Sequence, residues 1–331
     1  MITREQGRDP VTSASRRRRR MGAPLRIGLV GVGKIARDQH LPALAASPDF
    51  VLAAVASRDG RVEGVPGFDT VEAMLAEGPR LDAITICTPP RGRAAIARTA
   101  LGAGKAVMIE KPPGVTVSEV AALEATAAEA GVTLFAAWHS REAPGVAAAR
   151  DWLAGRALRS VAITWREDIR VWHPGQAWIL EAGGFGVFDA GINALSIATA
   201  ILPQPLAVLG GELSFPEGRE APIAAALGLV CGPAPVAVDL DFRQIGPQVW
   251  DIVVDTDAGQ LRLSDGGHRL FVDGAPQPLA EAEAGAEYPR LYRRFAELIA
   301  DGARDVDVRP LTLVADAFRA AHRTVVAPFA F

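Results

Sequence analysis

The chain has 331 residues, of which 49% are hydrophobic and 22% are charged. This length exceeds what one hydrophobic core usually supports, so two domains are expected. The composition excludes a disordered or fibrous protein. No stretch reaches the roughly 18 to 20 uncharged apolar residues of a membrane span, and only two cysteines are present, so the sequence predicts a cytoplasmic protein without membrane contact.

The charge is unevenly distributed. Residues 1–20 contain seven arginines and two acidic residues, whereas the remainder contains 28 basic and 36 acidic residues. Nucleic-acid binders carry basic residues on a folded face, so no nucleic-acid partner is predicted. The arginine run is not followed by the apolar region of an export signal. Residues 1–22 are therefore interpreted as a disordered, Arg-rich extension.

Residues 23–140 alternate short apolar runs with Ala-rich segments of helical period. Continuous apolar runs are typical of strands covered on both faces. The predicted strands are Leu25–Val30, Phe50–Ala56, Asp82–Cys87, Ala106–Ile109 and Val132–Ala137. The predicted helices are Lys34–Ala46, Arg91–Ala103 and Ser118–Ala130. This alternation predicts an α/β Rossmann domain with a doubly wound parallel sheet.

Residues 141–331 follow a different pattern, in which several strands come without intervening helices. Predicted strands are Leu158–Trp165, Leu206–Phe215, Ile223–Val230, Pro235–Phe242, Val249–Asp255 and Leu261–Leu263. Predicted helices are Pro144–Leu153, a segment near Asp189–Leu202, Tyr288–Ala300 and Leu311–Val325. Such an order predicts an α+β substrate and oligomerisation domain with a large open, mostly antiparallel sheet. Its terminal helix is expected to pack back on the Rossmann domain.

A glycine-rich turn stands between the first predicted strand and helix. Gly31 permits a tight turn, Gly33 lets the backbone approach a pyrophosphate, and Ala36 lets the helix pack closely on the sheet. Lys34 and Ile35 open the helix, whose free N–H groups attract phosphate. These residues predict a dinucleotide site.

The end of the second strand bears on the choice of cofactor. NAD sites usually carry a carboxylate there, which binds the ribose 2′-hydroxyl. Here Ser57 and Arg58 end the strand and can bind a 2′-phosphate, whereas Asp59 only follows them. The sequence therefore predicts NADP, with NAD also accepted.

Polar and small residues follow the next strands at the edge where open α/β sheets bind ligands. They are Cys87, Thr88 and Pro89 after one strand and Glu110 and Lys111 after another. The chain has three lysines against 32 arginines. A lysine can exchange a proton, whereas an arginine stays charged. Lys111 is therefore a candidate catalytic residue.

Several motifs resemble one known family. Gly31–Ala36, Glu110–Pro112 and Asp189–Asn193 are similar to motifs of the Gfo/Idh/MocA oxidoreductases, and the resemblance covers residues 25 to about 326. Five further segments resemble the members that act on aldoses: Asp38–Pro42, Trp138–Ser140, Trp165–Asp168, Trp172–Gln176 and Asp305–Pro310. The resemblance implies NAD(P)-dependent oxidation of an aldose, L-arabinose and also D-galactose, at the anomeric carbon to the aldonolactone. The alternatives are another sugar or an inositol as substrate, or a cofactor-bound sugar sensor without turnover.

Asp189 and Asn193 share one face if their segment is helical. Many relatives carry a histidine at the second position as the general base, and Asn193 cannot titrate. The base is then Asp189 or Lys111. We expect Asp189 to take the proton and Lys111 to stabilise the charge that develops on the sugar oxygen.

Other site residues follow from the resemblance. It implies that Glu167 and His173 line the sugar pocket beside tryptophan faces, that His139 contacts the cofactor near the nicotinamide, and that the protein forms a homodimer. His268 is interpreted as a surface or packing residue, and His40 as capping or packing its helix. The five histidines lack metal-ligand spacing, so no metal site is predicted.

Overall fold

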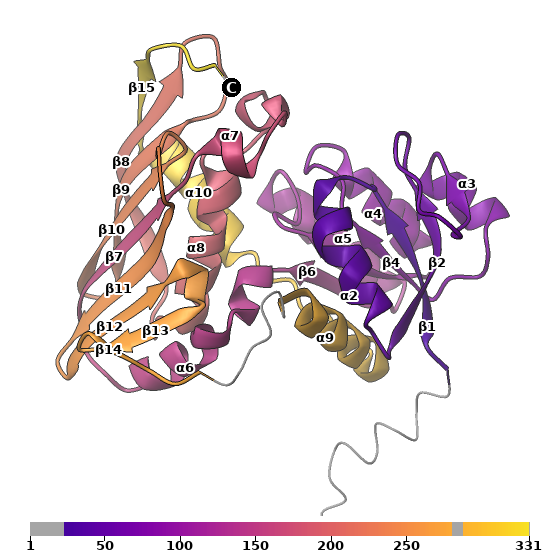
Figure 1. Ribbon diagram of the computed structural model, residues 1–331, viewed down its shortest axis with the longest axis horizontal. Coiled ribbons are helices and arrows are strands. Elements are labelled where there is room, and N and C mark those ends of the chain that lie inside the picture. The colour runs from indigo at the N-terminus through magenta and orange to yellow at the C-terminus, as the bar shows by residue number, and fades with distance from the viewer. Residues whose placement is uncertain (1–22, 280–286, 331) are drawn as a thin grey trace, which may run out of the picture.

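The computed structural model describes residues 23–279 and 287–330, which build two β-sheets with helices around them (Figure 1). The first sheet has six parallel strands in the order β3-β2-β1-β4-β5-β6. They are β1 (Leu25–Val30), β2 (Phe50–Ala56), β3 (Gly67–Phe68), β4 (Ala83–Ile86), β5 (Ala106–Glu110) and β6 (Leu134–Ala137). The order reverses beside β1, and doubly wound sheets bind ligands at such a reversal, beyond the carboxyl ends of the strands. The Rossmann prediction is confirmed.

Helices cover both faces of this sheet (Figure 1). They are α2 (Leu41–Ala45), α3 (Val71–Glu77), α4 (Arg93–Gly102) and α5 (Val117–Glu129), together with α9 (Glu287–Asp301) from the far end of the chain. The helix predicted over Lys34–Ala46 contains a π-helical stretch, Ala36–His40, and such stretches are frequent at functional sites. α9 is held by aromatic packing, because the ring of Phe295 stacks 5.6 Å from that of Phe50.

The second sheet has nine strands in the order β14-β13-β12-β11-β7-β10-β9-β8-β15. They are β7 (Leu158–Arg166), β8 (Leu206–Pro216), β9 (Ala224–Cys231), β10 (Ala234–Asp241), β11 (Val249–Thr256), β12 (Gly259–Ser264), β13 (Arg269–Val272), β14 (Ala275–Pro276) and β15 (His322–Val326). The pairs β7–β10 and β8–β15 are parallel, and the other pairs are antiparallel. The predicted open, mostly antiparallel sheet is thus confirmed.

Within the described part of the chain, helices lie on only one face of the second sheet, the face turned toward the first sheet (Figure 1). They are α6 (Pro144–Leu153), α8 (Phe188–Ile201) and α10 (Arg309–Ala320), and the short α7 (Ile169–Trp172) lies between the two sheets. α8 packs directly on β10, because Gly191 has no side chain. A Cβ at this position would lie 2.4 Å from Cδ1 of Leu240. This close approach places the first turn of α8 opposite the carboxyl edge of the first sheet.

The end of the chain corrects one prediction. A helix is expected over Leu311–Val325, but α10 ends at Ala320 and β15 pairs with β8. The last residues, Thr324 to Val326, are β-branched and fit a pleated sheet edge. No glycine or proline marks the end of the helix in the sequence. The helix ends at Ala320 because the following residues pair with β8, which is distant in the chain. The short β13 and β14 are likewise not indicated by the sequence.

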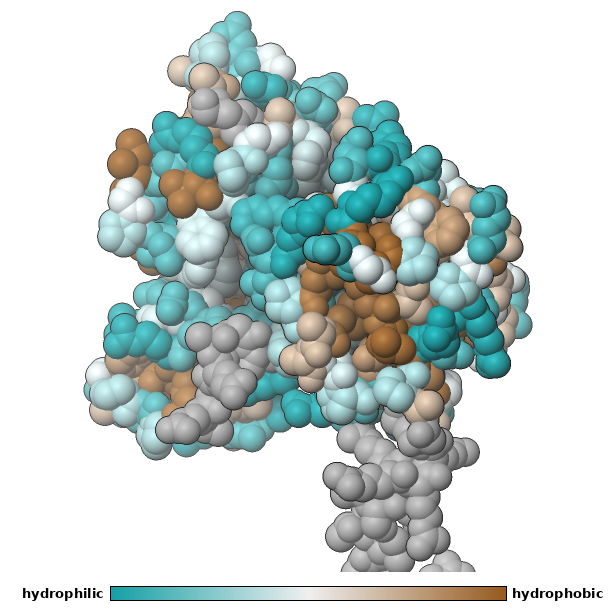
Figure 2. Space-filling view, turned by 45° about the vertical axis from the view of Figure 1, so that its right-hand side comes forward, coloured by the Kyte–Doolittle hydropathy of each residue, from teal (hydrophilic) through white to brown (hydrophobic). Residues whose placement is uncertain are grey.

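The surface and the helices add two findings. Figure 2, in which the half around the first sheet comes forward, shows one large hydrophobic area bordered by hydrophilic residues, and smaller hydrophobic groups elsewhere on this face. None of the described helices combines the length and the apolar character needed to cross a bilayer. The boundary between domains at residue 140 stays a prediction, and the predicted extension 1–22 lies outside the described residues.

Candidate active site

A cavity of about 640 Å³ lies between the carboxyl edge of the first sheet and the elements that cover the second. The edge of the first sheet contributes the turn after β1 and the ends of β4, β5 and β6, and the opposite wall comes from α8 and from the loop after β7. Thirteen of the predicted site residues line it: Gly33, Lys34, Ile35, Cys87, Thr88, Pro89, Glu110, Lys111, His139, Glu167, His173, Asp189 and Asn193. The sequence thus identified groups from both walls of one cavity.

The glycine turn fits a dinucleotide. Gly31 has φ +91°, and a Cβ there would lie 2.9 Å from Cγ2 of Thr88, so a side chain is excluded. A Cβ on Gly33 would meet no atom within 4 Å, which leaves open space over its backbone at the cavity wall. The helix that starts at Lys34 directs its first N–H groups toward this space. Gly31, Gly33 and Lys34, together called the glycine cradle, would hold a pyrophosphate.

Ser57 and Arg58 lie outside the cavity, at the end of β2. The Ser57 hydroxyl accepts a hydrogen bond of 3.2 Å from the backbone N–H of Gly60. Arg58 is exposed. The chain end of β2 adjoins the glycine turn, since the N–H of Gly31 donates to the carbonyl of Ala56 over 2.8 Å. Ser57 and Arg58 therefore follow directly after the residue that bonds to the glycine turn.

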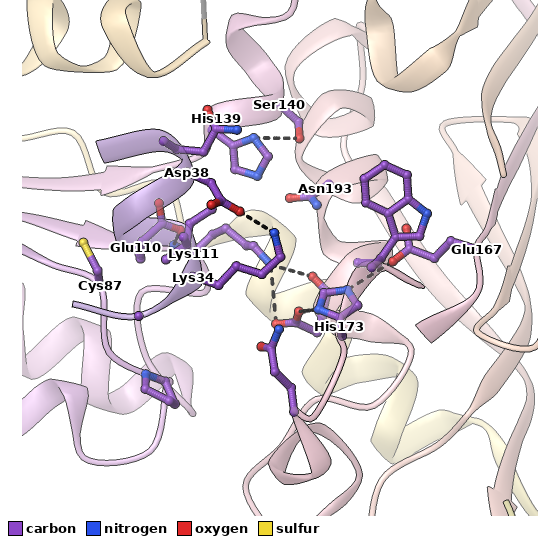
Figure 3. Close-up of a pocket in the computed structure, with 18 of the residues that line it drawn as sticks. Lys34, Asp38, Cys87, Glu110, Lys111, His139, Ser140, Glu167, His173 and Asn193 are labelled. Atoms are coloured by element: carbon purple, nitrogen blue, oxygen red, sulfur yellow. Dashed lines mark hydrogen bonds and ion pairs between the residues drawn. The ribbon is translucent and has the colours of Figure 1, made fainter. Parts of the chain in front are cut away.

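Lys111 projects into the cavity (Figure 3). There it meets Asp189, which lies 78 positions later in the chain. The Lys111 Nζ donates a 2.8 Å hydrogen bond to the carbonyl oxygen of Asp189 and lies 3.4 Å from its Oδ1. Their side chains retain only 14% and 8% of their exposure, so the pair is screened from most of the solvent. Asp189 stands in the first turn of α8, where the helix dipole stabilises a negative charge.

A buried polar cluster around Glu110 contacts the backbone of Lys111. The Glu110 carboxylate accepts hydrogen bonds from the backbone N–H of Lys111 (2.9 Å) and the hydroxyl of Tyr288 (2.8 Å). Nε2 of His40 lies 3.1 Å from Glu110 Oε1, and His40 Nδ1 lies 2.8 Å from the hydroxyl of Tyr292. His40 is fully buried. The sequence indicated a packing role for it, but the structure gives it a carboxylate partner.

This cluster shifts two pKa values. Burial raises the pKa of Glu110, but the hydrogen bond and the charge of His40 outweigh it and hold the pKa at about 2. Burial lowers the pKa of His40, but the neighbouring Cys87, Tyr292 and Glu110 outweigh that effect and raise it well above its usual value. Glu110 and His40 therefore form a charged pair beneath the cavity.

Sequence reasoning missed Arg93. Its side chain is buried, and Nε donates to the carbonyl of Thr88 (2.8 Å) while Nη1 donates to the carbonyl of Glu110 (2.6 Å). Burial lowers the pKa of Arg93 to about 10, against the effect of the Glu110 charge. Arg93 thus ties the segment after β4 to the segment that bears Lys111. An arginine in the first turn of a predicted helix gives no signal for this role.

Opposite Lys111, two further polar side chains form a pair. His173 Nε2 lies 3.1 Å from Glu167 Oε1, and the indole N–H of Trp250 donates to Glu167 Oε2 over 2.9 Å. The ring of Trp250 lies 4.8 Å from that of Trp172 and 5.5 Å from that of Trp165. An aromatic wall with two polar groups can bind a sugar ring, whose C–H faces pack on indole. Asn193 lies on the same side of the cavity (Figure 3).

His139 lies at the third side of the cavity, where its Nδ1 is 2.6 Å from Glu287 Oε2. His268 approaches the same carboxylate, at 3.6 Å from Oε1. His268 was expected at the surface or in packing. It is exposed as expected, and it also lines the cavity. Glu287 opens α9 and carries no sequence motif, so only the tertiary fold reveals it.

Comparison with known proteins supports these observations. Residues 25–138 match the model of the Gfo/Idh/MocA oxidoreductases, a family with an NAD-binding Rossmann fold. The chain is 47% identical to galactose 1-dehydrogenase of Pseudomonas fluorescens over 309 residues, which cover 92% of this chain and 99% of that protein. The crystal structure of D-galactose-1-dehydrogenase from Rhizobium etli superposes with a TM-score of 0.87 at 53% identity, over 93% of this chain and 98% of that one.

A more distant structure shares the fold alone. It is a 3-ketoreductase from Actinomadura kijaniata solved with NADP and TDP-benzene, with a TM-score of 0.79 at 21% identity over 92% of this chain and 99% of that one. The family match, the near-complete coverage of the galactose 1-dehydrogenases and the glycine cradle agree with one another. The chain belongs to the Gfo/Idh/MocA family of oxidoreductases.

Proposed function

We propose that the protein is an NAD(P)-dependent aldose 1-dehydrogenase that oxidises D-galactose and L-arabinose to their aldonolactones. The observation that carries the proposal is the contact of Lys111 with Asp189 inside a cavity that also holds the glycine cradle. Two relatives of high identity are named galactose 1-dehydrogenases. The two sugars share their hydroxyl arrangement through C4 and differ at C5, so one pocket accepts both, with a preference of only ~1–3 kcal/mol.

The residues of the cavity have separate tasks in this reaction. A dinucleotide held at the glycine turn would supply the acceptor for the hydride of the anomeric carbon. Asp189 takes the proton of the O1 hydroxyl, and Lys111 donates a hydrogen bond to that oxygen and stabilises its developing charge. Glu167 and Asn193 bind hydroxyls of the sugar and fix which carbon faces the nicotinamide. The tryptophan wall packs on the ring and excludes water.

A panel of aldoses tests the proposal. NADP and NAD reduction is followed by absorbance with D-galactose, L-arabinose, other aldoses and inositol. We expect turnover with the first two sugars. Turnover only with inositol or another sugar would refute the substrate assignment. Sugar binding without turnover on any substrate would instead identify a sensor.

We further propose that NADP is preferred, because Ser57 and Arg58 follow β2 directly and supply a hydroxyl and an exposed guanidinium. Arg58→Ala should weaken NADP binding about tenfold, which corresponds to about 1.4 kcal/mol. NAD binding should stay within about twofold. Titration calorimetry with both cofactors measures this, with Arg98→Ala on the exposed face of α4 as the control. Equal losses for NAD and NADP would refute the role of Arg58.

We also propose a homodimer formed through the uncovered face of the second sheet. Small exposed residues, Ala162, Ala226, Gly228 and Ala237, line that face on three adjacent strands. Small side chains at these positions let a second sheet approach closely there. Sedimentation should give twice the chain mass. Ala237→Glu should yield monomers, whereas Ala128→Glu on exposed α5 should not. A monomeric wild type would refute the proposal.

A further inference from the structure

His173 lies between two carboxylates in the cavity (Figure 3). Its Nε2 is 3.1 Å from Oε1 of Glu167, and its Nδ1 is 3.8 Å from Oδ2 of Asp189. Glu167 is more deeply buried than His173, since their side chains retain 4% and 17% of their exposure. The imidazole thus connects a buried carboxylate to the one that faces Lys111.

Glu167 sets the tautomer of this imidazole. One of its oxygens accepts the indole N–H of Trp250 and the other faces His173 Nε2. The backbone is fixed as well, because the N–H of Glu167 donates to the carbonyl of Asp241 over 3.0 Å. A carboxylate accepts hydrogen bonds, so the ring proton of neutral His173 lies on Nε2. The lone pair on Nδ1 is then directed toward Asp189.

Asp189 needs a second group to pass its proton to. Lys111 Nζ lies 3.4 Å from Oδ1, so this oxygen already faces the amine. The other oxygen, Oδ2, faces the free lone pair of His173. Catalytic contacts are often long without substrate and shorten in the complex, so 3.8 Å is within reach of a small side-chain rotation.

We propose that His173 is a proton relay that returns Asp189 to its charged form in each turnover, an inference that rests on the proposed aldose oxidation. The O1–H bond breaks and its proton passes to Asp189 Oδ2, and from there to His173 Nδ1. The electron pair of the C1–H bond goes to the nicotinamide, and C1 and O1 form the lactone carbonyl. The imidazolium is stabilised by Glu167 and releases its proton to solvent. His173 thereby supplies an imidazole that Asn193, four residues after Asp189, does not.

The surroundings of His173 define what the relay requires. The charged groups that face it are Glu167 after β7 and Asp189 on α8, and Lys111 reaches it only through Asp189. From β10 it meets the uncharged ring of Phe242, 5.5 Å away. His173 must be neutral to accept a proton.

Replacement of His173 tests the relay. In His173→Gln we expect kcat to fall about 100-fold. Galactose affinity, measured by tryptophan fluorescence of the enzyme–NADPH complex, which cannot oxidise the sugar, should change less than threefold. Imidazole added to His173→Ala should restore part of kcat. His322→Gln, at an exposed position on β15, serves as the control. An unchanged kcat with a raised KM would overturn the relay.

A second measurement does not depend on turnover. The ¹⁵N chemical shifts of the His173 ring, assigned by their loss in His173→Gln, should show the Nε2–H tautomer in the neutral form of the wild-type holoenzyme. The Nδ1–H tautomer would overturn the proposal. If the wild type oxidises no aldose, the proposed function fails and the relay fails with it. If it oxidises galactose and His173→Gln keeps its kcat, only the relay fails.

Discussion

Lys111→Ala should lower kcat for galactose oxidation about 1000-fold. The substitution removes the amine that stabilises charge on the sugar oxygen and leaves Asp189 without its cationic partner, and loss of such a group costs ~10²–10³ in kcat. NADP affinity should change less than threefold, because the glycine cradle and the end of β2 are untouched. The measurements are steady-state kinetics and cofactor titration by fluorescence.

Lys105→Ala is the matched control for this variant. Lys105 directly precedes β5, whereas Lys111 directly follows it, so the two lysines lie at opposite ends of one strand. Lys105 lies outside the cavity lining. Its replacement should leave kcat within twofold of the wild type. If Lys111→Ala retained near wild-type turnover, the catalytic role of the amine would be wrong.

Glu110→Ala should lower the free energy of unfolding by about 3–5 kcal/mol. It leaves the charge of His40 and the hydroxyl of Tyr288 buried without their carboxylate partner, and breaking a buried ion pair costs about this much. Urea unfolding of the full chain measures the loss. Glu129→Ala, at an exposed position of α5, should change stability by less than about 0.5 kcal/mol. A loss for Glu110→Ala no larger than that would show that the pair does not stabilise the fold.

The pH dependence of stability gives an independent check on Glu110. The pKa of Glu110 is about 2 in the folded protein, against an ordinary value of 4.5. A depressed pKa contributes stability that is complete above pH 4.5 and is lost as the pH falls toward about 2, and the shift corresponds to about 3 kcal/mol. His40 acts in the opposite sense, because its raised pKa contributes stability below its ordinary pKa that is lost as the pH rises through the folded value. Glu110→Ala should lose the acid part of this dependence.

Five of the six strands of the first sheet follow from local sequence, whereas the two-residue β3 was not predicted. β1 and β2 have the predicted bounds, because continuous apolar runs are required wherever both faces of a strand are covered. The end of α10 does not follow, since Thr324 to Val326 become a strand only through pairing with β8. Local pattern therefore predicts elements that are stable by their own composition, and it fails where a distant partner decides between helix and strand.

The candidate site divides in the same way. The glycine turn and Lys111 carry local signals, a spacing and a rare residue type, so the sequence could indicate them. The pairing of His40 with Glu110 spans 70 residues, and that of Tyr288 with Glu110 spans 178. Neither pairing has a local pattern, because both depend on α9 and the π-helical stretch packing around the end of β5. Contacts of this kind become visible only in the fold.

The most direct test of the account is a crystal structure of the protein with NADP and D-galactose. The account predicts that the anomeric O1 lies about 3 Å from both Lys111 Nζ and a carboxylate oxygen of Asp189, with C1 facing the nicotinamide ring. A sugar bound with its anomeric carbon away from this pair, or outside the cavity, would contradict it.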